Sequence, residues 1–206
     1  MDRVAAFIDG FNMYHSLCEN GCDRFKWINY WNLANAFVIQ SREQLVNVFY
    51  FSALTPWNQE KMNRHKMYIR ALEMQGVKII LGKFKPVVKK CRADCRLSYK
   101  TFEEKETDIN IAVTMLLEAS RDTFDKALLF SGDSDMIAGV RALKEFAPHK
   151  HIKAVIPYHR SSIDLVNNCH SMSRLKRKHI ENNQLPERIE LCAGTGQFLV
   201  RPPEWS

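Results

Sequence analysis

The sequence predicts an α/β fold with a mostly parallel central sheet that is flanked by helices. Short apolar runs recur at wide intervals, as strands that are buried on both faces do. Longer segments with apolar residues at spacings of three and four lie between them, which is typical of amphipathic helices. At 206 residues, 46% of them hydrophobic and 26% charged, the chain is long enough to bury its own core. Alternation of strands and helices then favours parallel pairing.

The predicted strands are continuous apolar runs. The first, Val4–Ile8, ends at Asp9 and Gly10, where the chain is expected to turn into the next element. The other runs share its pattern and lie at Leu45–Phe51, Val77–Leu81, Ala127–Phe130 and Ile152–Ile156.

The predicted helices separate these runs. In one of them Ile109, Val113, Leu116 and Leu117 fall at helical spacing. The segments with this pattern are Tyr30–Ile39, Trp57–Gln75, Asp108–Ser120 and Ser134–Phe146. Beyond Ile156 the pattern weakens, and only a helical turn at Ser162–Val166 is expected.

Residues 83–105 break this rhythm. They carry eight basic residues, three acidic residues and two cysteines between a predicted strand and a predicted helix. The stretch is either a hairpin or a long surface loop, and the sequence leaves both open.

The charge balance favours an anionic partner. Thirty Lys and Arg against 23 Asp and Glu give a formal net charge of +7, and nucleic acid is the leading partner class. The first residues lack the pattern of a signal peptide, and no apolar run approaches the ~20 residues of a membrane span. We therefore expect a cytoplasmic chain without a membrane partner, whose six cysteines are reduced thiols or metal ligands.

Carboxylates follow two of the predicted strands. Asp9 comes after the first strand, and Asp133 and Asp135 lie in the segment SGDSD (131–135) after the fourth. Asp108 opens the helix after the basic stretch and is expected at the same sheet edge, where ligands of parallel sheets gather. Such a cluster repels itself unless a divalent cation binds, and carboxylate oxygens favour Mg²⁺ or Mn²⁺.

Another interpretation makes Asp133 and Asp135 turn and helix-cap residues. Their combination with Asp9 after a different strand favours the metal site. A haloacid-dehalogenase mechanism is disfavoured, because it needs an acid where Phe11 stands, and the chain has no glycine-rich phosphate loop.

Three segments together resemble a known family. FIDGFNMY (7–14), EKETDINIA (104–112) and ALLFSGDSD (127–135) are similar, in order and interval, to the signature segments of the NYN domain, in the LabA-like branch of the PIN-like nucleases. The resemblance extends over about residues 3–189. It implies a PIN-like three-layer fold over residues 1–189, with residues 83–105 as an insertion and 190–206 as a tail.

The resemblance also implies a function. It indicates a metal-dependent endoribonuclease that hydrolyses RNA with one or two Mg²⁺ or Mn²⁺ ions, with single-stranded DNA left open as a substrate. By position, the metal-binding acids are Asp9, Asp108, Asp133 and Asp135. Asn12 and Ser131 match polar residues that position water or phosphate oxygens, and we count them with the catalytic set.

Two departures from the family pattern bear on this function. Glu106 stands where many members have glycine, and either adds a carboxylate or faces solvent. Cys169 and His170 stand where a late acidic residue is expected. The alternative is therefore a non-catalytic, RNA-binding or regulatory adaptor that keeps the nuclease fold.

The cysteines and histidines suggest no further site. The pairs Cys18 and Cys22, and Cys91 and Cys95, have a spacing compatible with Zn²⁺, but we favour buried apolar cysteines over a zinc site. No histidine is assigned as a ligand, and the roles of His15 and His170 stay open.

The basic stretch is the predicted RNA-binding surface. Its cations alternate with aromatic residues, a combination that can follow a phosphate backbone while a ring stacks on a base. A solvated loop is the other interpretation. The predicted RNA-binding residues are Lys83, Lys85, Lys89, Lys90, Arg92, Arg96 and Lys100.

Overall fold

A six-stranded, fully parallel sheet forms the centre of the molecule. The computed structural model describes residues 1–91, 97–192 and 194–205. Within them the sheet order is β3-β2-β1-β6-β7-β8, and each neighbouring pair is parallel. The strands are β1 (Asp2–Asp9), β2 (Glu43–Ser52), β3 (Lys78–Leu81), β6 (Lys126–Phe130), β7 (His151–Ile156) and β8 (Ser171–Arg174).

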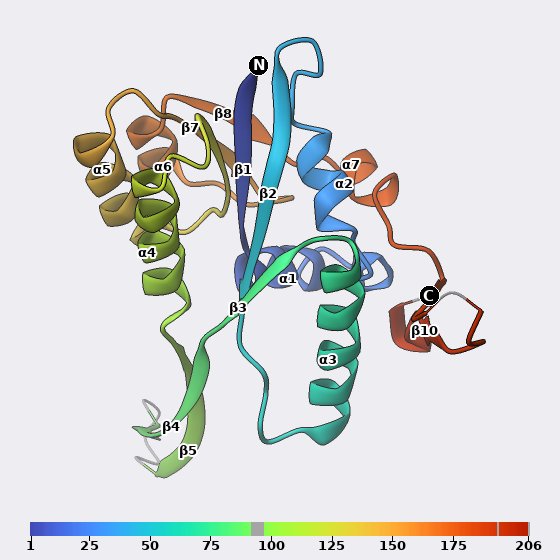
Figure 1. Cartoon of the computed structure of the whole chain (residues 1–206). Coiled ribbons are helices and arrows are strands. Elements are labelled where there is room, and N and C mark those ends of the chain that lie inside the picture. Colours follow the sequence, from blue (N-terminus) through green and yellow to red (C-terminus); the bar gives the residue numbers. More distant parts are fainter. Residues whose placement is uncertain (92–96, 193, 206) are drawn as a thin grey trace.

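Helices cover both faces of this sheet (Figure 1). One face carries α1 (Gly10–Cys18), α2 (Tyr30–Asn35), α3 (Gln59–Met74) and α7 (Arg177–Glu181). The other carries α4 (Thr107–Ser120), α5 (Ile137–Phe146) and α6 (Ile163–Asn168). This confirms the predicted α/β class and the three-layer, PIN-like arrangement.

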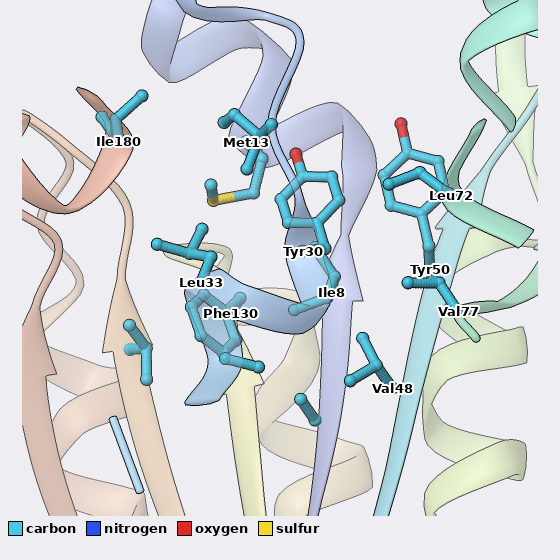
Figure 2. Packing of buried hydrophobic residues seen from close by; sticks show 14 of the residues in the cluster. Ile8, Met13, Tyr30, Leu33, Val48, Tyr50, Leu72, Val77, Phe130 and Ile180 are labelled. Atoms are coloured by element: carbon cyan, nitrogen blue, oxygen red, sulfur yellow. The ribbon is translucent and has the colours of Figure 1, made fainter. Parts of the chain in front are cut away.

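Alternating side chains of the strands fill both interfaces between sheet and helices. Ile8 of β1 points into the first helical layer, where it packs near Tyr30 and Leu33 of α2 (Figure 2). Its neighbour Phe7 points into the second layer and stacks on Phe49, with ring centroids 5.3 Å apart. Strands buried on both faces read as continuous apolar runs, which is why the sequence predicted them.

The strand order places a crevice at one edge of the sheet. From β1 the chain adds β2 and β3 on one side, and it later adds β7 and β8 beyond β6 on the other. The order therefore reverses between β1 and β6. Ligands of parallel sheets bind outside the carboxyl ends of the strands at such a switch point.

The basic stretch forms an antiparallel hairpin, which was one of its two predicted forms. β4 (Lys83–Lys90) pairs with β5 (Ser98–Lys105) over eight residue pairs. The hairpin projects from the body of the molecule between β3 and α4 (Figure 1). Arg92 and Arg96, which were predicted to bind RNA, and Cys95 of the disfavoured zinc site lie outside the described residues.

Two helices are shorter than their apolar patterns predicted. α2 ends at Asn35 instead of Ile39, because Phe37 and Val38 turn into the core after the C-cap Ala36. α3 begins at Gln59 instead of Trp57, because the Asn58 side chain caps it by accepting a hydrogen bond from the Lys61 N–H (2.9 Å).

The end of the chain also packs on the fold. β9 (Arg188–Glu190) pairs with β10 (Phe198–Val200), and a last short helix spans Pro203–Trp205. The Trp205 ring lies 6.1 Å from that of Trp27. Among the described residues, no helix combines the length and the apolar character needed to cross a membrane.

Candidate metal centre

Asp9 is a buried carboxylate at the end of β1. It also caps α1, because its Oδ1 accepts a hydrogen bond from the Asn12 N–H (3.0 Å), while its Oδ2 accepts one from the Ser131 hydroxyl (2.8 Å). The side chain of this residue is held in one orientation, and the residue is only 4% exposed. A larger residue is excluded at the next position: a Cβ on Gly10 would lie 2.5 Å from the Phe51 carbonyl.

The loop after β6 is tied to this first motif. The Gly132 N–H donates to Asn12 Oδ1 (3.0 Å), and the Asp133 N–H donates to Ser131 Oγ (3.0 Å). Asp133 in turn caps the short helix at Ser134–Met136 by accepting from the Asp135 N–H (3.0 Å). Asp133 is therefore also a cap residue, which was the competing interpretation. The two interpretations are compatible, because one carboxylate carries several acceptor lone pairs.

Asp108 lies in the first turn of α4. The Thr107 N–H donates to Glu104 Oε1 (3.0 Å), and the Thr107 hydroxyl donates to the same oxygen. Glu106 caps the helix with φ 80°, a left-handed conformation, and forms an ion pair with Lys83. The resemblance implies glycine at this position, and glycine adopts this conformation without steric strain.

Three of the predicted acids converge. Ligand oxygens of Asp108, Asp133 and Asp135 all lie within 4.8 Å of one another. Asp108 and Asp133 also line a cavity of about 210 Å³ at the carboxyl edge of the sheet. Asp9 and Asn12 line the same cavity, whereas Ser131 is fully buried beneath it. The sequence placed these four acids at one edge, and the described structure has all of them there.

The acids raise one another's affinity for protons. Burial raises the pKa of Asp9 to about 6, against the lowering effect of its bonds to Asn12 and Ser131. The pKa of Asp108 is also raised to about 6, first by burial and then by the negative charges of Asp9 and Asp133. A divalent cation would relieve this repulsion, and the carboxylate set is the kind that Mg²⁺ and Mn²⁺ prefer.

Sequence reasoning missed several residues of the cavity wall. Phe11 and His15 come from α1, Glu104 from the end of β5, Thr107 from the start of α4, and Arg160 from the loop after β7. Glu104 belongs to the second signature segment, so that segment already contained the signal. Arg160 lies in the stretch YHRS (158–161), which also resembles the family, but that resemblance assigned it no role.

Arg160 is the only lysine or arginine among the described residues that line this cavity. Its Nη2 pairs with Glu19 Oε1 (2.8 Å), and its Nε is buried without a hydrogen-bond partner among the described residues. A Cβ on Gly132 would lie 3.2 Å from the Arg160 Cβ, so glycine at this position lets the Arg160 loop approach the acids.

The remaining motif residues lie elsewhere. His170 Nδ1 accepts from the Ile152 N–H (3.0 Å) near the start of β7, at the opposite edge of the sheet from the acids. Cys22 is buried and donates its thiol to the Asn20 carbonyl (3.4 Å). Among the described residues, no group of cysteines or histidines gathers as metal ligands.

The predicted RNA-binding lysines divide between two faces of the hairpin. In antiparallel strands, directly paired residues share a face, and faces alternate along each strand. Lys83, Lys85 and Lys89 therefore share one face, and Lys90 and Lys100 share the other. Lys83 pairs with Glu106, and Lys89 with Glu103 (2.8 Å).

Comparison with known proteins identifies the family. The crystal structure of a protein of unknown function from Vibrio parahaemolyticus is 15% identical, with a TM-score of 0.59, and the match covers 89% of this chain and 96% of that one. At this identity the likeness shows the fold alone. No curated protein matches the chain. The model of the NYN domain matches residues 3–176, and with the three signature segments meeting at one cavity the chain belongs to the NYN domain family.

Proposed function

We propose that this protein is a metal-dependent ribonuclease that hydrolyses RNA phosphodiester bonds. The observation that carries the proposal is the convergence of Asp108, Asp133 and Asp135, with ligand oxygens within 4.8 Å of one another, beside a cavity at the switch point of a parallel sheet. Membership of a nuclease-like domain family supports the same reaction class.

The metal in this proposal is Mg²⁺ or Mn²⁺. Asp108, Asp133 and Asp135 hold it, with Asp9 as a further acid of the same cavity. The fit rests on the donor set and on the pKa of Asp108, which burial first and then the negative charges of Asp9 and Asp133 raise to about 6. When bound, such an ion polarises a phosphate oxygen and makes water more acidic.

The neutral residues of the site position the substrate. Because Asn12 Oδ1 accepts from the Gly132 N–H, the Asn12 amide is fixed with its NH₂ group as the remaining donor for a phosphate oxygen. Ser131 is fully buried and donates its hydroxyl to Asp9, so it orients Asp9 and is not a nucleophile. Water is then the attacking group, and Asp135, the exposed member of the triad, is a ligand or accepts the proton.

Arg160 adds a positive charge to the wall of the cavity that Asp9, Asp108 and Asp133 line. Its guanidinium offers donors beyond the one that holds Glu19, and a partly exposed guanidinium in the same cavity wall as the carboxylates suits a phosphodiester. The acids with their ion and Arg160 would thus contact different oxygens of one phosphate.

The test is a cleavage assay on purified protein. Single-stranded and structured RNA are incubated with Mg²⁺, Mn²⁺ or EDTA, alongside Asp133→Asn. We expect cleavage with a divalent ion, none in EDTA, and a loss of at least about a hundredfold in Asp133→Asn. Asp164→Asn, at an exposed acid of α6 that does not line the cavity, is the matched control and should keep full activity. Binding of RNA without cleavage under any ion would instead favour the adaptor.

A further inference from the structure

A chain of aromatic rings leads away from the acidic cavity. Phe11, which lines the cavity, contacts Phe84 of β4 edge to face, with ring centroids 5.5 Å apart. Phe84 contacts Trp57 in the same geometry at 4.7 Å. Trp57 lies parallel to Phe102 of β5, with centroids 4.0 Å apart and planes 16° apart. The rings link the cavity to the hairpin without a gap.

These rings lie on one defined face of the hairpin. Phe84 pairs with Glu104, Pro86 with Phe102, Val88 with Lys100 and Lys90 with Ser98, so all of these residues share that face. The end of this face that lies near the body of the molecule includes Glu104, which lines the cavity. Lys100 and Lys90 place cations at the far end of the face. The face is about 20 Å long, from the rise of ~3.4 Å per residue over β5.

Trp57 is held in place and yet exposed to solvent. Its ring stacks on Phe102, yet the residue as a whole remains 47% exposed. Contacts with Phe84 and Phe102 and the cap at Asn58 fix the residue just before α3. A large ring that is fixed and half exposed is a ready platform for stacking.

The opposite face of the hairpin has a different charge pattern. Lys89 and Lys105 both pair with Glu103, and Lys83 pairs with Glu106. These lysines are partly neutralised by acids of their own surface. On the aromatic face, Lys90 and Lys100 make no ion pair with a residue that the structure describes. Aromatic rings and cations therefore occur together on one face.

We propose that a single-stranded nucleic acid leaves the acidic cavity along this aromatic face, with a base stacked on Trp57 and phosphates near Lys100 and Lys90. The inference rests on the proposed function and adds the form of its substrate. A duplex does not fit, because its bases already stack on each other and leave no free face for Trp57. The alternation of rings and cations is that of strand-binding surfaces that tolerate any sequence.

The test measures binding alone. Fluorescence anisotropy follows labelled decamers of uridine and of thymidine in EDTA, where the proposed hydrolysis cannot proceed. Trp57→Leu, which keeps apolar contact with Phe84 and Phe102, should weaken binding by about 5- to 100-fold, whereas Trp57→Phe should keep most of the affinity. Tyr99→Leu, which removes an exposed ring from the opposite face, is the matched control and should bind as wild type.

Three further readouts separate stacking from a structural effect. Thermal unfolding should be nearly the same for Trp57→Leu and Trp57→Phe. An abasic decamer should bind both variants equally, and so should a duplex of the same length. Equal loss on the duplex or the abasic strand, or unchanged affinity in Trp57→Leu, would overturn the inference. If wild type cleaves RNA but Trp57→Leu binds with unchanged affinity, the ribonuclease proposal stands and the inference about Trp57 fails. If binding depends on Trp57 but no cleavage occurs, only the ribonuclease proposal fails.

Discussion

At the scale of single residues, the site places oriented carboxylates in positions that range from buried to exposed. Asp9 illustrates this: two hydrogen bonds orient it, yet burial and nearby Asp133 still raise its pKa to about 6. The folded protein therefore binds a proton at Asp9 more tightly than the unfolded chain does, whose ordinary value is 3.8. By linkage, the stability from this group is complete below pH ~4 and is lost as the pH rises through about 6.

Asp9→Asn tests this linkage directly. In EDTA at pH 7 the variant should be more stable than wild type by about 1–3 kcal/mol, because it removes a buried negative charge, and the difference should narrow below pH 4. Chemical denaturation at several pH values measures the free energy of unfolding. Asp164→Asn on α6 should show no such gain. A gain in Asp9→Asn that does not change with pH would contradict the assigned cause.

Arg160 provides a second prediction at this scale. If its guanidinium contacts the substrate phosphate, Arg160→Ala should weaken binding of a non-cleavable RNA analogue by about 10- to 100-fold, the range for a hydrogen bond to a charged group. Arg141→Ala removes an exposed arginine of α5 that contacts Asn168, and it should bind as wild type. Equal affinities for Arg160→Ala and wild type would assign Arg160 to the Glu19 ion pair alone.

Some residues of the site could be predicted from the sequence, and others could not. Asp9 and Asp133 follow apolar strands of a parallel sheet, so their place at one edge follows from topology. Arg160 lies in a stretch that resembles the family, but its place in the cavity depends on a tertiary contact between its loop and Gly132, which the sequence does not show. Glu104 belongs to the second signature segment, but its hydrogen bond from the Thr107 N–H depends on where α4 begins, which the sequence does not specify.

At the scale of elements, the start of α4 carries a strained cap. Glu106 has φ 80°, which costs a residue with a Cβ about 1–2 kcal/mol, whereas its exposed ion pair with Lys83 returns at most about 1 kcal/mol. Glu106→Gly should therefore raise the melting temperature by a few degrees. Glu106→Ala keeps the strain and loses the ion pair, so it should melt no higher than wild type. If the melting temperature rises equally in Glu106→Gly and Glu106→Ala, the positive φ of Glu106 is not a source of strain.

Elements were predictable where burial dictated their residues. β1 is apolar from Val4 to Ile8 and ends at the buried Asp9, and its bounds extend the predicted run by only a few residues. β8 (SMSR) was not predicted, because this short edge strand is only partly buried and carries polar residues. The hairpin was ambiguous for a similar reason: most of its side chains are in water, so no period-two apolar pattern marks it.

At the scale of the whole molecule, charge is divided between an acidic cavity and a basic hairpin. If nucleic acid follows the aromatic face, replacing Lys90 and Lys100 together by Ala should lower the slope of log affinity against log salt by about 1.4, at about 0.7 per phosphate contact on a single strand. Replacing Lys83 and Lys85 on the opposite face should change the slope less. A larger change from the second pair would place the strand on that face.

The same division of charge separates an enzyme from an adaptor through the effect of metal on binding. In the hydrolase, an ion held by Asp108, Asp133 and Asp135 also attracts the scissile phosphate, so Mn²⁺ should strengthen binding of a non-cleavable RNA analogue. Asp108→Ala should remove most of that gain, since it deletes one of the three converging carboxylates. Asp164→Ala, outside the cavity, should retain it.

An adaptor held by the hairpin alone behaves in the opposite way. Divalent salt screens phosphates from lysines, so its affinity should fall slightly with Mn²⁺. Asp108→Ala should then be neutral or bind more tightly, because a negative charge near the strand is gone. Titrating the analogue with and without Mn²⁺ against wild type and Asp108→Ala therefore distinguishes the two. We expect affinity that rises with Mn²⁺ in wild type and is nearly independent of it in Asp108→Ala.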